Sequence, residues 1–238
     1  MINIISSFFV SKTNQPELDH LRTTEISDCI LKNVSLDFVE KVHLFVDNIE
    51  SLNYLIQITK HTDKIVIIKV GKRPKYTDFY HYILHNLKNN ICMITNIDIY
   101  LHECDTNLIE SLKRSKTAYA ITRHEHDMNK INIEYYTGSH DSYIFNSAFL
   151  ENAIINEHTD FHQNMLGIET HVIKNLHDNG FRILNPCEQI KIVHLHKSNL
   201  RSYGCELIGL HNDDETFRQS SWCVPPTIVH YNEHNNIM

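Results

Sequence analysis

The sequence predicts one α/β domain built on a central, mainly parallel sheet flanked by helices. Short β-branched runs alternate with helical patterns three times in the first hundred residues, as in βαβ units with right-handed crossovers. The run Lys64–Val70 is apolar at nearly every position, which is typical of a strand covered on both faces. A chain of 238 residues with 42% hydrophobic and 21% charged residues has ordinary globular composition. No linker, low-complexity tract or repeat divides it.

The first half of the chain carries the clearest elements. Pro16 suits the first position of a helix. We place the apolar face of that helix on Leu18, Leu21, Ile26, Cys29 and Ile30. The predicted strands are Ile2–Val10, Val42–Val46, Lys64–Val70 and Ile91–Thr95, and the predicted helices are Pro16–Asn33, Glu50–Thr59 and Tyr76–Leu87.

The second half is less regular. Here we predict helices over Leu108–Lys113 and Ile168–Asp178, and strands over Thr117–Thr122, Ile131–Tyr136, Phe181–Leu184 and Ile190–Leu195. The pattern weakens beyond Tyr203, so we expect a domain at 1–203, with halves 1–100 and 101–203, and a C-terminal extension at 204–238 that forms a surface loop or tail.

Charge and cysteine content exclude whole classes of protein. Lys and Arg number 22 against 29 Asp and Glu, a net charge of −7, which argues against a nucleic acid polymer as partner. No apolar run approaches the ~18 residues of a membrane span, and the N-terminus lacks the pattern of a signal peptide. The six cysteines form no CxxC pair and are expected to be reduced, mostly buried thiols. We expect a cytoplasmic protein.

The 18 histidines raise the question of a metal. His194 and His196 lie two apart in a predicted strand, so both side chains point to one face. They are either metal ligands or half-buried histidines bonded to backbone carbonyls. No cysteine lies beside them, so a tetrahedral zinc site is not indicated. His124 and His126 fall in a charged segment and are expected to be solvated loop residues.

Asp98 follows a buried strand directly. Ligands of such sheets bind beyond the carboxyl ends of the strands, here after Val10, Val46, Val70 and Thr95. A carboxylate at that edge either forms a turn or serves as one of a few protein ligands to a hard divalent cation. We expect Asp98→Ala to leave the fold intact, because a carboxylate at a strand end contributes little packing.

Further segments carry a resemblance to a known family, in one order over about Ile2 to Tyr203. They are Gly71–Tyr80 (GKRPKYTDFY), Ile91–Tyr100 (ICMITNIDIY), Ala118–Arg123 (AYAITR), Gly138–Asn146 (GSHDSYIFN), Gly167–Glu169 (GIE), Asn185-Pro186 and Val193–Asn199 (VHLHKSN). This series resembles glycosyltransferases of the GT-A fold, in a group seen in large DNA viruses and bacteria.

The resemblance implies a GT-A type, Rossmann-like fold in one domain, whose first half binds the nucleotide and whose second half holds the acceptor. It implies a nucleoside-diphosphate sugar donor, with a UDP-sugar favoured, and a glycan or glycoprotein acceptor. It further implies an inverting transfer and, for a viral protein, a location in the host cytoplasm. It also implies Mn2+ or Mg2+, held by an Asp-x-Asp-like motif and a late histidine. Asp98 and His196, with His194 as the alternative, fit that set, whereas Asn96 replaces the first Asp.

The same resemblance implies a catalytic carboxylate. An inverting transfer needs a base that takes the proton of the attacking hydroxyl. Asp141 and Glu169 are the candidates; we assign the base to Asp141 and place Glu169 next. Asp141 also suits a turn, and Glu169 also suits the first turn of a helix.

Residues that grip the nucleotide-sugar are expected near these carboxylates. Arginine offers planar bidentate contacts to phosphate, which favours Arg73 and Arg123 over the lysines. The chain lacks GxxxxGK[ST] and GxGxxG, so P-loop and dinucleotide-binding sites are not indicated. The predicted nucleotide-sugar-binding residues are Asn96, Arg73, Tyr76, Asp78, Arg123 and Lys197.

Two other functions remain open from the sequence. Asn96 fits a module that binds sugar nucleotides or glycans without turnover, and the two His-x-His pairs fit a metal hydrolase.

Overall fold

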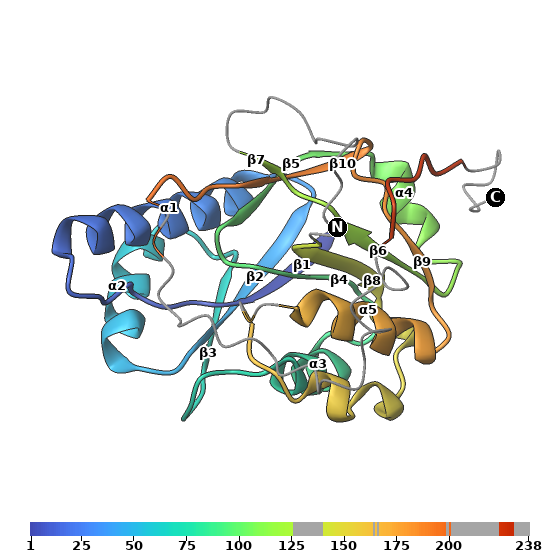
Figure 1. The fold of residues 1–238 in the computed structure, drawn as a ribbon, viewed down its shortest axis with the longest axis horizontal. Coiled ribbons are helices and arrows are strands. Elements are labelled where there is room, and N and C mark those ends of the chain that lie inside the picture. Colours follow the sequence, from blue (N-terminus) through green and yellow to red (C-terminus); the bar gives the residue numbers. More distant parts are fainter. Residues whose placement is uncertain (126–139, 164, 166, 199, 201–223, 231–238) are drawn as a thin grey trace.

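The computed structural model describes residues 1–125, 140–163, 165, 167–198, 200 and 224–230 (Figure 1). These residues form a seven-stranded sheet in the order β3-β2-β1-β4-β8-β6-β9 and a three-stranded sheet in the order β5-β10-β7. The strands are β1 (Ile2–Ser7), β2 (Val39–Val46), β3 (Ile65–Lys69), β4 (Ile91–Thr95), β5 (Ile99–Cys104), β6 (Thr117–Ile121), β7 (His124–Glu125), β8 (Ser142–Asn146), β9 (Arg182–Leu184) and β10 (Ile190–His194).

The large sheet is mainly parallel, as predicted. Strands β1, β2, β3 and β4 run parallel, and β8 is antiparallel to both of its neighbours, β4 and β6. The helices are α1 (Pro16–Ser35), α2 (Ile49–Thr59), α3 (Tyr76–Asn86), α4 (Thr106–Ser111) and α5 (Ile168–Asp178), with 3-10 turns at Ser147–Phe149, Asn152–Ile154 and Glu157–Thr159.

Both faces of the large sheet are covered. In β1, Ile4 packs with α1, α2, α4 and the small sheet, whereas Ile5 packs with α3 and α5 on the other face. Met93 and Ile94 of β4 alternate in the same way. Figure 1 shows α3 and α5 on one side of the sheet and α1 with β5 and β10 on the other. The central strands are therefore buried on both faces.

The edge position of β3 corrects one expectation. Its apolar run predicts a strand covered on both faces, but β3 pairs only with β2, and Ile65 to Ile68 are half-buried. A short apolar run specifies a strand but not its place in the sheet.

The buried face of α1 also differs from the predicted one. Ile26, Cys29 and Ile30 are buried, but Leu21 is 40% exposed, and Arg22 and Glu25 are buried instead. The helix is rotated so that two charged side chains face the protein.

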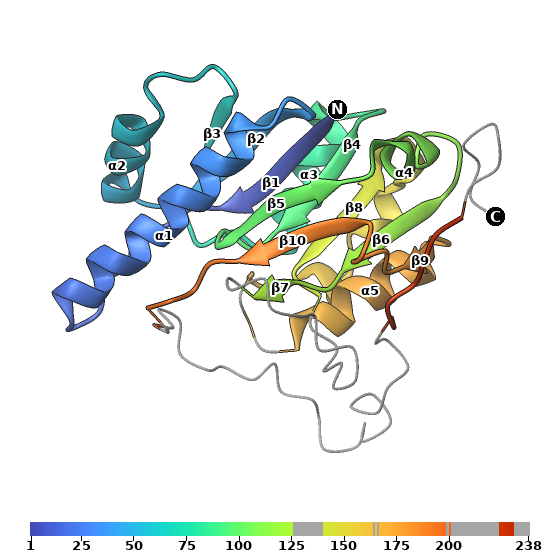
Figure 2. The same ribbon diagram turned by 90° about the horizontal axis from the view of Figure 1, so that it is seen from above.

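The sequence pattern did not predict that β5, β7 and β10 form a separate small sheet. Strand β5 follows β4 after the turn 96–98 and pairs antiparallel with β10, which in turn pairs parallel with β7 (Figure 2). The sequence pattern indicated β10, but not β5 and β7 of this sheet or β8 of the large sheet. Because β5 follows β4 directly, its pairing with β10 places the end of β10 next to the turn that follows β4.

Other parts of the chain bear on the remaining expectations. Val224 to His230 belong to the predicted extension, and Val229 is buried, with its backbone N–H donating to Gln189 Oε1 at 2.7 Å. The predicted strand Ile131–Tyr136 lies outside the described residues. The cysteines that the structure describes are free, and all but the half-buried Cys104 are buried; they are Cys29, Cys92, Cys104 and Cys187. Among the described helices, none is long and apolar enough to cross a membrane.

Candidate active site

The candidate site lies where the strand order reverses. Strand β1 leads through α1 to β2 on one side, and β3 leads through α3 to β4 on the other, so the reversal falls between β1 and β4. Ligands of open α/β sheets bind at the carboxyl ends of strands on either side of such a point. The ends of these two strands are joined there, because Ser6 Oγ donates to the Thr95 carbonyl at 2.8 Å.

The side chain of Gln163 forms hydrogen bonds to the ends of both strands. Its Oε1 accepts from the backbone N–H and the hydroxyl of Ser7, at 3.0 and 2.9 Å, and its Nε2 donates to the Thr95 carbonyl at 2.8 Å. Gln163 is buried, and its own carbonyl accepts from Arg73 Nη2 at 2.7 Å. One side chain thus fixes the ends of β1 and β4 and touches a predicted nucleotide-binding residue.

Asp98 is buried in the turn between β4 and β5. Its Oδ2 accepts from Arg22 Nη2 at 2.5 Å and contacts His194 Nε2 at 3.0 Å. Burial alone would raise the pKa of Asp98, but the hydrogen bonds and charges of His194 and Arg22 outweigh it and hold that pKa well below its usual range. The carboxylate is therefore charged.

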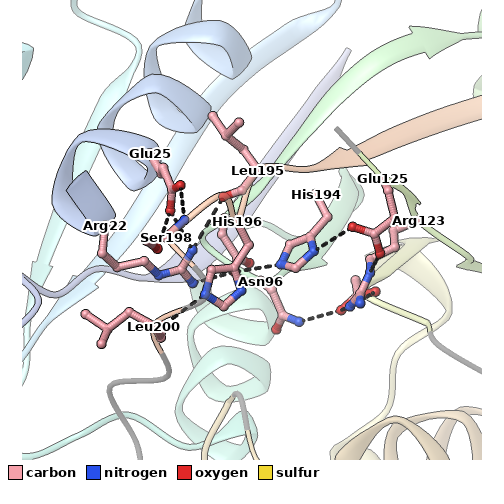
Figure 3. Close-up of polar contacts among 12 residues, drawn as sticks. Arg22, Glu25, Asn96, Arg123, Glu125, His194, Leu195, His196, Ser198 and Leu200 are labelled. Atoms are coloured by element: carbon pink, nitrogen blue, oxygen red, sulfur yellow. Dashed lines mark hydrogen bonds and ion pairs between the residues drawn. The ribbon is translucent and has the colours of Figure 1, made fainter. Parts of the chain in front are cut away.

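His194 and His196 reach Asp98 because of strand register. His194, the last residue of β10, pairs with Ile99 of β5, and the Leu195 N–H donates to the Asp98 carbonyl at 2.9 Å. One ligand atom from each of Asp98, His194 and His196 lies within 4.8 Å of the others. His196 Nε2 also contacts the carbonyl of Leu200 at 2.9 Å. Both predicted histidines lie side by side in the site (Figure 3), and the predicted aspartate is the third member of this cluster.

This donor set fits a divalent cation. It offers one carboxylate oxygen and two imidazole nitrogens, a mixture that suits Mn2+ better than Mg2+, which prefers oxygen ligands. His194 Nδ1 lies 3.4 Å from Glu125 Oε2, so a carboxylate orients the ring from its far side, as is common for metal-bound histidines. The Arg22 guanidinium on Asp98 is the feature that a metal would have to accommodate.

Asp141 and Asn96 form the neighbouring part of the site. Asp141 is buried, and its Oδ1 accepts from Asn96 Nδ2 at 2.9 Å. Arg123 Nη1 lies 3.3 and 3.2 Å from the two carboxylate oxygens. Asn96 thus binds Asp141, a contact that an aspartate at position 96 would replace with repulsion.

Glu169 lies in the first turn of α5, half-buried. Burial raises the pKa of Glu169 to about 7, and the negative charge of Asp141 acts in the same direction. Gly167 precedes the helix with φ +88°, a left-handed conformation that favours glycine. A carboxyl group with this pKa takes up and releases protons near neutral pH.

The other predicted nucleotide-binding residues have different surroundings. Tyr76 is buried, and burial, followed by the charges of Glu169 and other neighbours, raises its pKa well above the usual value. Asp78 closes the N-terminus of α3, where its Oδ2 accepts from the Lys75 N–H at 2.8 Å. Lys197 is exposed beside the metal-ligand candidates.

A hollow lies beyond the ends of β1 and β2. It is lined by Val10 and Lys12 after β1 and by Asn48 to Ser51 at the start of α2. It borders two of the four strand ends at which the sequence predicts a pocket, those at Val10 and Val46, and not those at Val70 and Thr95.

The expectation for His124 is wrong. This side chain is buried in β7, and its Nε2 contacts the carbonyl of Cys187 at 3.1 Å. The charged neighbours suggested a solvated loop, but pairing of β7 with β10 turns the ring inward. His126 lies outside the described residues.

Sequence analysis missed four polar residues that shape the site: Arg22, Glu25, Glu125 and Gln163. A signal existed for Arg22 and Glu25, because they flank the predicted apolar positions of α1 at helical spacing. Glu125 was read as part of a charged loop. No local pattern marks Gln163, whose contacts are all distant in sequence.

Comparisons with known proteins bear on the fold. No protein-family model and no curated protein sequence matches the chain. The mannosyltransferase PcManGT from Pyrobaculum calidifontis, solved with GDP-Man and Mn2+, is similar over 82% of this chain and 56% of its own, with 14% identity and a TM-score of 0.51.

Two further solved structures are similar. TarS of S. aureus (residues 1–349) matches 81% of this chain and 60% of its own, with 12% identity and a TM-score of 0.55. A protein from Desulfovibrio desulfuricans G20, described as a nucleotide-diphospho-sugar transferase, matches 77% and 78%, with 6% identity and a TM-score of 0.52. The chain thus spans little more than half of the mannosyltransferase and TarS structures. At these identities the likeness concerns the fold, and it confirms the mixed α/β architecture that the GT-A resemblance implies.

Proposed function

We propose that this protein is an inverting glycosyltransferase that moves a sugar from a nucleoside-diphosphate sugar to a hydroxyl of a glycan or related acceptor. The observation that carries this proposal is the meeting of Asp98, His194 and His196 at the strand-order reversal of a sheet with the glycosyltransferase fold. A glycosyltransferase similar to this chain is described with GDP-Man and Mn2+, which supports the same donor class here.

In this proposal Asp98, His194 and His196 would hold Mn2+, which would supply the positive charge that stabilises a leaving diphosphate. Arg73 and Arg123 provide further cationic contacts to the donor, and Gln163 keeps the ends of β1 and β4 in place beneath it.

Glu169 is the base that its raised pKa favours. The acceptor oxygen forms a bond to the anomeric carbon, the bond from that carbon to the diphosphate oxygen breaks, and the hydroxyl proton passes to the Glu169 carboxylate. A pKa of about 7 suits this step. Asp141 is already bonded to Asn96 and Arg123, so it serves better to position these groups than to take a proton. This reverses the order of the two candidates set by sequence.

The test uses the purified protein with Mn2+ and a panel of UDP-, GDP- and dTDP-sugars. We expect release of free nucleotide from one donor, lost in Asp98→Asn and kept in Glu103→Gln, a control that removes one exposed carboxylate of β5. Donor binding without nucleotide release on long incubation with candidate acceptors would instead identify a binding module. Unchanged release in Asp98→Asn would remove the metal role from this site.

A further inference from the structure

Arg22 places a buried positive charge in the candidate metal site. Its guanidinium lies on the Oδ2 atom of Asp98 at 2.5 Å, and both side chains are about nine-tenths buried. His194 Nε2 contacts the same oxygen at 3.0 Å. The carboxylate that would bind a cation is therefore neutralised from within the chain by a residue on α1.

Arg22 has two further hydrogen-bond acceptors besides Asp98. Its Nη1 lies 3.4 Å from Glu25 Oε2 and 3.4 Å from the carbonyl of Leu195 (Figure 3). Glu25 is buried as well, and its carboxylate also accepts from the N–H and the hydroxyl of Ser198, at 2.7 and 2.8 Å. A guanidinium with a second carboxylate beside it can release the first without becoming an unpaired buried charge.

One donor atom of Arg22 is unused. Among the described residues, Arg22 Nε is buried without a hydrogen-bond partner. Such a group is rare because an unmet buried donor costs stability. A different arrangement of the guanidinium could therefore satisfy more of its donors.

We propose that Arg22 is an internal cation that competes with the divalent metal for Asp98, so that the metal binds weakly alone and tightly only together with a nucleoside diphosphate. The proposal rests on the proposed function for its ligands. Arg22 and a metal ion repel each other, and both need the same carboxylate. The negative charges of a diphosphate offset that repulsion, and they offer the released guanidinium a bidentate partner.

The test measures Mn2+ affinity by titration calorimetry and by the signal of free Mn2+ in electron paramagnetic resonance, with Mn2+ alone and then with UDP or GDP present. In Arg22→Gln we expect Mn2+ alone to bind about tenfold more tightly or better, because the competing charge is gone. Arg22→Lys keeps the charge and should stay near the wild type. Lys32→Gln removes the same charge from an exposed position of α1 and serves as the matched control.

Glu25→Gln gives the opposite sign. It removes one of the two buried carboxylates that pair with Arg22 and leaves Asp98, so Mn2+ alone should bind more weakly than in the wild type. If Arg22 and Glu25 merely shaped the site, both Arg22→Gln and Glu25→Gln would weaken Mn2+ binding, and that result would overturn the competition. Melting curves without metal report whether each variant folds. If Arg22→Gln does not fold, Arg22→Lys decides the question: a Mn2+ affinity near that of the wild type supports the competition, and a loss of affinity overturns it.

The measurements with UDP or GDP distinguish a failure of this inference from a failure of the proposed function. UDP or GDP should tighten Mn2+ binding in the wild type and do so less in Arg22→Gln. If no nucleotide binds to any form while Mn2+ alone follows the expected order, the proposed function fails and the competition stands. If nucleotide binds and is released from donor but Arg22→Gln leaves Mn2+ affinity unchanged, the competition fails and the proposed function stands.

Discussion

Glu169 is the residue whose environment most directly suits catalysis. Its carboxyl group lies at the start of α5, half-buried and within the field of Asp141, and its pKa is raised to about 7. The group is charged, and able to accept a proton, only above that pH. A base with this property loses activity on the acid side.

We therefore predict that kcat/KM falls about tenfold per pH unit below about pH 7, as Glu169 becomes protonated. Glu169→Gln should lower kcat by roughly 10²–10⁴ and retain nucleotide affinity. The measurement is the pH profile of transfer, with Glu157→Gln, an exposed carboxylate, as control. A Glu169→Gln enzyme that keeps both its rate and the acid limb would exclude Glu169 as base.

The burial of Asp98 makes this residue important for stability as well as for the candidate site. As a strand-end carboxylate it was expected to tolerate Asp98→Ala without loss of stability. The structure revises this expectation, because the substitution would leave the buried Arg22 without its closest partner. Breaking one side of a buried ion pair is costly. Asp98 variants therefore need a measured melting temperature beside every activity assay.

At the scale of elements, the segment before α5 joins strands that are distant in sequence. Gln163 fills the point between the ends of β1 and β4, with one acceptor for Ser7 and one donor for Thr95. The two strands are already paired in register over Ile2 to Ile5, so this side chain fixes only their carboxyl ends. Those ends border the candidate site.

Gln163→Leu should lower the free energy of unfolding by about 1–3 kcal/mol, since it leaves buried polar groups of Ser7 and Thr95 without this partner. Urea denaturation measures the change. Gln57→Leu, on the exposed side of α2, is the control and should change stability by no more than ~0.5 kcal/mol. Equal losses in the two variants would show that the bridge contributes nothing to stability.

At the scale of the whole molecule, buried histidines couple stability to pH. Burial lowers the pKa of His43 to about 4 and that of His140 to about 4. Both rings use their nitrogens internally; His43, for example, contacts Tyr82 and Asn3. The folded state therefore binds fewer protons than the unfolded state, whose histidines titrate near pH 6.5.

Stability should consequently be full above about pH 6.5 and fall as the pH drops toward 4, by up to about 3 kcal/mol for each such histidine. Chemical denaturation at pH 7 and at pH 5 measures the loss. His43→Gln should reduce the difference between the two values, whereas the exposed His20→Gln should not. The same pH dependence in both variants would assign the acid limb to other groups.

The sequence by itself determined the βαβ order, most helix bounds and the residues at the strand ends. Hydrophobic periodicity and breakers are local, so Ile91–Thr95 and Ile168–Asp178 were predicted with the observed bounds. Asp98, His194 and His196 followed from a motif resemblance that is also read along the chain. The structure brings them to one point, and their role as metal ligands stays a prediction.

Only the tertiary structure decided which side chains surround these residues. The pairing of β10 with β5, the rotation of α1 that buries Arg22, and the place of Gln163 between β1 and β4 all depend on contacts between segments far apart in sequence. Local patterns carry no information about such partners, because many residues could pack against the same apolar face. That packing set the charge of the candidate site, on which the binding of any cation there depends.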